Sequence, residues 1–297
     1  MLFVVDFDET ITAHDTISCL ANAANKPDVW KFLANSYWEE YMAWKSGLPK
    51  LTTLSSHLNL LQAGGFAETA SLQRVQSYKF FQGLSMEQLD AVASSITLRD
   101  GFDKFLQSLM PRLRDRSDEF HILSINWSSR VIQNTLRRIP GIDVGLVTIH
   151  SNDLEVDPTT RLTTGNIVPY HTTTLVMTAD DKTREFMAIV QQASSASSHP
   201  HTTVYIGDSS TDFGCFVQAT IGILFLANEQ SKLTLESFTD VTLLNIDPSF
   251  PNFNLNESSQ LHPIPRSQSR PSKVLNTFNT TIYTCDQWSI LAQVFWR

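Results

Sequence analysis

Two aspartates near the start of the sequence, Asp6 and Asp8, stand two residues apart and directly follow the apolar run Leu2–Val5. On an extended chain, side chains at positions i and i+2 point to the same side, so both carboxylates would face one space. Paired carboxylates can divide a reaction: one attacks phosphorus, and the other gives a proton to the leaving oxygen and then activates water. Taken alone, the pair is also typical of a polar turn.

A second acidic pair, Asp208 and Asp212, lies in the segment 207–212, which follows the apolar residues 204–206. Gly207 permits a sharp exit from a strand, and the two aspartates would then lie one helical turn apart. Oxygen ligands of this kind suit a hard cation, and magnesium usually takes one or two carboxylates together with water and phosphate oxygens. Capping of the following helix is the alternative role for these residues.

Two further residues could bind an anion. Ser124 ends the apolar run 120–123, and its hydroxyl and the free backbone amides of a helix start would form a small anion site, unless the serine only caps the helix. Lys182 lies at the start of a predicted helix, where its charge opposes the helix dipole, so capping does not account for it. Its charge would stabilise negative charge on a transferred phosphoryl group.

These residues need elements that bring them together. Continuous apolar runs separated by helical patterns predict buried parallel strands, and therefore an α/β fold with a doubly wound parallel sheet. The predicted strands and helices are Leu2–Val5, Phe120–Leu123, Thr203–Ile206 and Ile221–Phe225, and 102–113, 131–138 and 183–192. Ligands of such sheets bind at the carboxyl ends of the strands, where Asp6, Ser124 and Asp208 stand.

The chain divides into a core and an insertion. We predict a core of residues 1–13 and 97–297 and a helical cap of residues 14–96, because the inserted segment has helical spacing and no strand pattern. Its aromatic residues are Trp30, Tyr37, Trp38, Tyr41 and Trp44, among others. A core-facing stripe is the simpler interpretation of this row, and contact with an aromatic leaving group is the alternative. Residues 247–273, rich in proline, are expected to form an irregular insertion.

The composition of the sequence limits the kinds of molecule that the protein could bind and the compartment in which it could work. The 297 residues carry a net charge of −8 without a basic run, which argues against nucleic acid. The three widely spaced cysteines argue against a disulfide framework, and no apolar run approaches the roughly 20 residues of a membrane span. Because the sequence also lacks a signal-peptide pattern, we expect a cytoplasmic protein that does not bind membranes.

In their order and placement, the motifs resemble those of the haloacid dehalogenase superfamily of phosphohydrolases. The matching residues are Asp6–Thr10 for the pattern DxDxT, Ser124, Lys182, and Gly207-Asp208 with Asp212. The resemblance covers roughly residues 1–12 and 97–225, with the helical segment where this superfamily places its first type of cap. Residues 151–157 and 165–167 also resemble a hairpin of the phosphoserine-phosphatase-like group.

The resemblance implies a phosphatase that acts on a small phosphorylated metabolite. Asp6 would attack phosphorus and form an aspartyl-phosphate. Asp8 would protonate the leaving alcohol and then deprotonate the hydrolytic water. Ser124, Asn126 and Lys182 would bind the phosphoryl oxygens.

The resemblance also implies Mg²⁺ as the cofactor. The ion would bind Asp6, the backbone carbonyl of Asp8, and Asp208. Asp212 would lie behind these ligands and orient a metal-bound water or Lys182.

The sequence departs from the family pattern beside Ser124. Asn126 stands where this group often has glycine, and the bulky Trp127 follows, which would narrow the phosphate end of the pocket. The pair is similar to the Cys-Trp or Asn-Trp of relatives of the plant thiamine-monophosphate phosphatase domain, which makes thiamine monophosphate one substrate hypothesis.

Other functions stay open at this point. Dehalogenases of this superfamily lack the second motif acid, so Asp8 favours phosphate as the substrate. A phosphomutase would need to retain a phosphorylated intermediate, and the sequence does not exclude one. A catalytically silent regulator is the alternative outside enzymes, although such proteins usually lose a motif acid. The oligomeric state is open as well.

Overall fold

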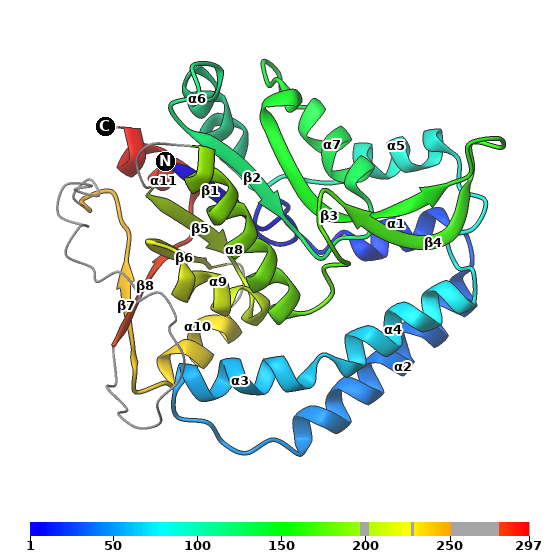
Figure 1. The fold of residues 1–297 in the computed structure, drawn as a ribbon, viewed down its shortest axis with the longest axis horizontal. Helices are drawn as coiled ribbons and strands as arrows, with labels where there is room; N and C mark the ends of the chain where they lie inside the picture. Colours follow the sequence, from blue (N-terminus) through cyan, green and yellow to red (C-terminus); the bar gives the residue numbers. More distant parts are fainter. Residues whose placement is uncertain (197–201, 227–228, 251–278, 297) are drawn as a thin grey trace.

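The computed structural model describes residues 1–196, 202–226, 229–250 and 279–296, and its central feature is an eight-stranded sheet of order β4-β3-β2-β1-β5-β6-β8-β7. The strands are β1 (Leu2–Val5), β2 (Glu119–Leu123), β3 (Val147–Val156), β4 (Thr163–Tyr170), β5 (Thr203–Gly207), β6 (Ile221–Phe225), β7 (Val241–Asn245) and β8 (Thr280–Cys285). Neighbouring strands are parallel except for the antiparallel pair β3 and β4. Figure 1 shows β7 and β8 at one edge and β4 at the other. The predicted parallel α/β sheet is confirmed.

Helices cover both faces of this sheet, as in a doubly wound fold. The core helices are α6 (Phe102–Arg114), α7 (Ser129–Arg137), α8 (Ala179–Ala196), α9 (Phe213–Gln218), α10 (Glu229–Glu236) and α11 (Trp288–Trp296), with short 3-10 helices at Val144–Leu146 and Ser210–Asp212. Strand β1 shows why both faces must be covered. Phe3 and Val5 pack in one apolar core with α6 and α11, whereas Leu2 and Val4 pack in another with α8 and α9. A strand that is apolar at every position is buried on both sides.

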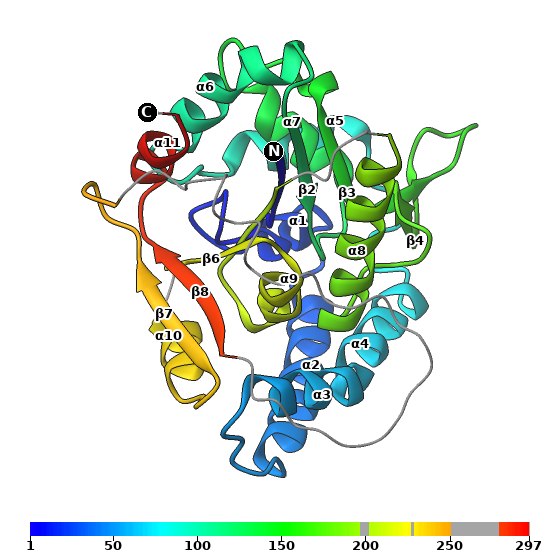
Figure 2. The ribbon, with the colours of Figure 1, turned by 60° about the vertical axis from the view of Figure 1, so that its left-hand side comes forward.

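Between β1 and β2 the described chain forms helices. They are α1 (Ile17–Ala23), α2 (Pro27–Ser46), α3 (Leu54–Gly64), α4 (Phe66–Ser77) and α5 (Met86–Ser95), followed by α6. The chain leaves and re-enters the core at one place, where Thr12 and Leu98 form an antiparallel bridge. Figures 1 and 2 show α2, α3 and α4 together along one side of the molecule. The domain boundaries after residues 13 and 96 stay a prediction.

Some elements differ from the sequence interpretation. The first half of β3 joins the main sheet next to β2, and only its second half pairs with β4. Strand β7 was not predicted, because Val241–Asn245 is only partly buried and lacks a continuous apolar pattern. The expected insertion 247–273 lies outside the described residues from position 251 onward. Among the described helices, none is long and apolar enough to cross a membrane.

Candidate active site

Three neighbouring strands bring the acidic motifs and Ser124 to one edge of the sheet. Asp6 follows β1, Ser124 follows β2, and Asp208 follows β5. Strand β1 pairs in parallel with both β2 and β5, so the three carboxyl ends lie side by side. All three residues are buried. The structure therefore places these predicted residues together at the carboxyl edge.

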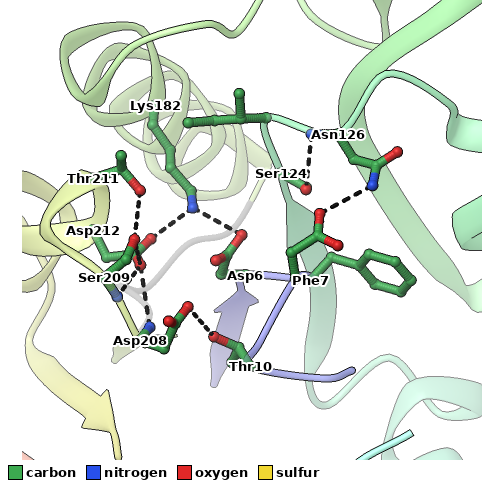
Figure 3. A network of polar contacts seen from close by, with 12 residues as sticks. Asp6, Phe7, Thr10, Ser124, Asn126, Lys182, Asp208, Ser209, Thr211 and Asp212 are labelled. Carbon is green, nitrogen blue, oxygen red and sulfur yellow. Dashed lines mark hydrogen bonds and ion pairs between the residues drawn. The ribbon is translucent and has the colours of Figure 1, made fainter. Parts of the chain in front are cut away.

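Lys182 lies between two of the aspartates. It comes from the first turn of α8, and its side chain is only 1% exposed. Its Nζ is 2.8 Å from Asp6 Oδ1 and 2.6 Å from Asp212 Oδ1 (Figure 3). Burial alone would lower the pKa of Lys182, but the carboxylates of Asp212 and Asp6 outweigh burial and raise it. The lysine therefore supplies a fixed positive charge beside Asp6.

Asp212 has partners on both of its oxygens. Its Oδ1 accepts a hydrogen bond from the Tyr205 hydroxyl at 2.7 Å in addition to the Lys182 contact. Its Oδ2 accepts hydrogen bonds from the backbone N–H groups of Asp208 at 3.2 Å and Ser209 at 3.0 Å. The loop fits closely, because a Cβ added at Gly207 would come within 2.8 Å of Asp212 Cβ. Asp212 thus links the loop that carries Asp208 to the Lys182 side chain.

The acidic cluster is suited to a cation. Asp6, Asp208 and Asp212 each offer an oxygen, and these atoms lie within 4.8 Å of one another. Asp208 Oδ1 accepts from the Thr10 hydroxyl at 3.1 Å. Asp208 Oδ2 is buried and has no hydrogen-bond partner among the described residues. An unpaired buried carboxylate oxygen is costly, and a bound cation with oxygen ligands would satisfy it.

The pKa values follow the same geometry. Burial raises the pKa of Asp6 to about 7, although Lys182 opposes the shift. Burial, together with the charges of Asp6 and Asp212, raises the pKa of Asp208 to about 9. A cation bound among these carboxylates would lower both pKa values, because it favours their charged forms.

The Asp8 carboxylate has other partners than the acidic cluster. Its Oδ1 accepts from the Thr16 backbone N–H at 2.8 Å and from the Thr16 hydroxyl at 2.6 Å. Its Oδ2 accepts from Asn126 Nδ2 at 3.0 Å. Burial, and to a lesser degree the charge of Asp15, raises the pKa of Asp8 to about 6. A carboxyl group with this pKa can both give and take a proton near neutral pH.

Asn126 and Ser124 occupy the loop after β2. The Ser124 hydroxyl accepts a hydrogen bond from the Asn126 backbone N–H at 3.1 Å. Asn126 Nδ2 contacts Thr16 Oγ1 at 2.8 Å as well as Asp8. Phosphate binding by Ser124 and Asn126 stays a prediction, and the contacts of Asn126 Nδ2 among the described residues are with Asp8 and Thr16.

A buried asparagine joins this loop to the segment before α8. Asn152 Nδ2 donates to the backbone carbonyls of Ile125 and Val176 at 3.1 Å and 2.8 Å. Its Oδ1 accepts from the Val176 backbone N–H at 2.9 Å. Asn152 thus connects the β2 loop with the segment that leads into the helix of Lys182.

The charged residues of the site were predicted from the sequence, but the residues that hydrogen-bond to them or connect their loops were not. The missed residues are Thr16, Tyr205 and Asn152. Tyr205 reads as one more apolar position of β5, and nothing in the local sequence marks the other two. Their contacts cross from one loop or element to another, so they become visible only in the folded chain.

The solved structures similar to this chain carry the predicted fold. One is a haloacid dehalogenase family hydrolase from Salmonella enterica serovar Typhi, with a TM-score of 0.51, 18% identity and coverage of 80% of this chain and 65% of that chain. Another is a phosphoserine phosphatase in its apo form, with a TM-score of 0.50, 18% identity and coverage of 78% of this chain and 90% of that chain. At this identity the likeness concerns the fold alone. The haloacid dehalogenase fold predicted from the motifs is confirmed.

The sequence comparisons point to a named family. No known family model matches the chain. A CTO1 family protein of Schizosaccharomyces pombe is 41% identical over 295 residues, which cover 99% of both chains.

Proposed function

The chain belongs to the CTO1 family, and we propose that it is a Mg²⁺-dependent phosphatase that hydrolyses a small phosphate monoester through an aspartyl-phosphate on Asp6. One observation carries this proposal. Lys182 is buried between Asp6 and Asp212, next to an Asp208 oxygen that has no partner among the described residues. The site thus combines a nucleophile, a fixed positive charge and a place for a cation, as phosphoryl transfer requires.

In the first step, an Asp6 oxygen forms a bond to phosphorus while the bond from phosphorus to the ester oxygen breaks. Asp8 gives its proton to that leaving oxygen, so the product leaves as an alcohol. Lys182 stays beside the phosphoryl oxygens, where negative charge develops. Ser124 is proposed to bind these oxygens from the neighbouring strand end.

In the second step, water attacks the phosphorus of the aspartyl-phosphate and the bond to Asp6 breaks. Asp8, now deprotonated, takes the proton of the water. Thr16 and Asn126 hold the Asp8 carboxylate in one orientation through both steps.

The residues present fit Mg²⁺, with Asp6, the backbone carbonyl of Asp8 and Asp208 as proposed ligands. Asp212 is not included, because hydrogen bonds and Lys182 already engage both of its oxygens. A bound divalent cation would neutralise charge on the phosphoryl group and polarise it. We further propose that residues 14–96 act as a cap that restricts the site to small substrates, and that the protein works in the cytoplasm.

The proposal is tested by phosphate release from a panel of metabolite monoesters, with magnesium and purified full-length chain. Thiamine monophosphate, phosphoserine and sugar phosphates belong on the panel. Asp6→Asn is expected to lower turnover at least about 10³-fold with the fold intact, because the nucleophile is removed. Asp28→Asn, an exposed change on α2, is the control and keeps full activity. More than about 1% residual activity in Asp6→Asn would contradict the proposal, on the scale of typical nucleophile losses.

A further inference from the structure

A cavity of about 390 Å³ lies between the long helix α2 and loops of the core. One wall is a row of aromatic side chains from α2: Tyr37, Trp38, Tyr41 and Trp44. The facing wall includes Ile125, Thr178 and residues 209–211. Such a volume is within the usual range for small-molecule sites, which are concave and mostly apolar.

These four rings are not part of the buried core. The apolar core clusters of the described residues do not include them, and Trp38 is 53% exposed. The rings contact one another instead: Tyr37 stacks on Tyr41 with centroids 5.9 Å apart, and Tyr41 lies 5.8 Å from Trp44. The core-facing interpretation of the row is therefore wrong for these rings. A continuous aromatic wall beside an open volume is typical of a binding surface.

The facing wall belongs to the loops of the proposed active site. Ile125 stands between Ser124 and Asn126, and Ser209 directly follows Asp208. The backbone carbonyl of Thr178 accepts a hydrogen bond from the Lys182 N–H at 3.0 Å. A phosphate held at Lys182 would thus have the aromatic cavity next to it, on the side of α2.

The charges of the cavity do not favour a second anion there. Its lining has one acid, Glu68, and one base, Lys45. Lys45 is exposed and lies over the Tyr41 ring at 5.7 Å. Glu68 Oε2 is buried and has no hydrogen-bond partner among the described residues. The cavity therefore suits an uncharged ring, and the unpaired Glu68 oxygen would accept a hydrogen bond from a donor on that ring.

From this arrangement we infer the substrate class: a phosphate monoester of an alcohol that carries an aromatic or heteroaromatic ring. The ring packs against the aromatic row of α2 while the phosphate lies at Lys182. This inference rests on the proposed function and deepens it. Since a cavity of about 150 Å³ is enough to hold benzene, a cavity of 390 Å³ accommodates one or two rings.

The first arm of the test compares benzyl phosphate with ethyl phosphate as substrates of the full-length protein. We expect kcat/KM to be at least about tenfold higher for the benzyl ester, as stacking and apolar burial predict. Tyr41→Ala removes the central ring and should abolish most of this preference. Phe32→Ala is the matched control, because Phe32 is an exposed ring on the same helix that contacts Tyr78 and does not line the cavity.

The second arm measures binding without chemistry. Benzylphosphonate and ethylphosphonate are titrated calorimetrically into wild type, Tyr41→Ala and Phe32→Ala. Tighter binding of benzylphosphonate that depends on Tyr41 but not on Phe32 supports the aromatic subsite, even if no ester is hydrolysed and the phosphatase proposal fails. Equal binding of both phosphonates, with Asp6-dependent hydrolysis of both esters at equal efficiency, overturns the subsite and leaves the phosphatase proposal standing.

Discussion

The two motif aspartates, two positions apart in sequence, have different surroundings. Asp6 touches the buried Lys182, whereas Asp8 accepts hydrogen bonds from Thr16 and Asn126. Two carboxylates in different environments can take different roles in one reaction. The contact with Lys182 suits Asp6 for attack, and the pKa of about 6 suits Asp8 for proton transfer.

Thr16 is expected to matter for catalysis although the sequence motif does not include it. Thr16→Val removes the hydroxyl that donates to Asp8 but keeps the shape of the side chain. We expect kcat to fall about tenfold or more with little change in KM, because a misplaced acid-base group affects the chemical step. Steady-state kinetics measures this split.

Thr16→Ser is the control, because it keeps the hydroxyl and should retain most of the activity. Full activity of Thr16→Val would show that the hydroxyl has no part in positioning Asp8.

The charged residues of the site could be predicted because residue type and spacing alone indicate which chemistry they can perform. Asp6, Asp8 and Asp208 closely follow strands that the apolar runs already indicate, and Asp212 lies one helical turn beyond Asp208. The orientation of Asn126 could not be predicted. Its amide reaches Asp8 and Thr16, and this depends on how the start of the cap returns to the β2 loop.

At the scale of elements, the strands of the site were predictable and their connections were not. The four predicted strands agree with the structure to within one residue at each end, since each is a short and mostly apolar run. Strand β3 pairs in parallel with β2 along its first half and antiparallel with β4 along its second half. No local sequence pattern marks where the pairing changes. The same holds for Asn152, which lies on β3 and joins two loops.

Removing the Asn152 side chain should lower the stability of the folded protein. Asn152→Ala leaves the Val176 N–H and the Ile125 carbonyl without this buried partner. We expect a loss of about 3 kcal/mol in the free energy of unfolding, in line with the cost of unsatisfied buried groups. Chemical denaturation measures this loss.

Asn35→Ala, an exposed change on α2, is the control and should alter the free energy of unfolding by less than about 0.5 kcal/mol. If Asn152→Ala were as stable as this control, the hydrogen bonds between the two loops would contribute nothing to the free energy of unfolding.

At the scale of the molecule, helix α3 joins the inserted segment to the core. The His57 ring on α3 lies 5.8 Å from the Phe213 ring and 5.2 Å from the Phe238 ring. Its Nε2 is buried without a partner among the described residues, and burial lowers the pKa of His57 below its ordinary value of 6.5. The folded protein therefore favours the neutral imidazole.

This contact predicts a dependence of stability on pH. Below pH 6.5 the unfolded chain binds a proton at His57 more readily than the folded chain, so stability falls as the pH drops through 6.5. His57→Leu should reduce the loss of Tm between about pH 7.5 and pH 5.5. Thermal unfolding at both pH values measures it, with the exposed His14→Leu as control. An unchanged pH dependence in His57→Leu would refute the assignment.

Cation binding should also be visible in the whole molecule, apart from activity. An ion bound only by the folded state stabilises it by about 2.7 kcal/mol at 100 times its Kd. We expect Mg²⁺ to raise Tm and EDTA to reverse the rise. Asp208→Asn should lose this response, because it removes the carboxylate that carries the unpaired oxygen. A rise in Tm that persists in Asp208→Asn would place the cation elsewhere.

The presence of a helical insertion was predictable from the sequence, but the position of its aromatic residues in the folded protein was not. Helical spacing indicated an inserted helical segment, and the structure describes five helices there. Which face of α2 lines the cavity depends on how the helices pack, so the place of the aromatic row could be learned only from the fold.

The most direct test of the account is to trap the phosphoryl group on the protein. Asp8→Asn should slow hydrolysis of the intermediate, because it removes the base that activates water. The variant is incubated with Mg²⁺ and 4-nitrophenyl phosphate, whose leaving group departs without a proton from Asp8, and is quenched in acid. The peptide that contains Asp6 is then analysed by mass spectrometry. We expect one phosphoryl group on Asp6, and none when Asp6→Asn is added to the variant. An unlabelled Asp6 in a preparation whose wild type releases phosphate from that ester, or a label that persists after Asp6→Asn, would contradict the account.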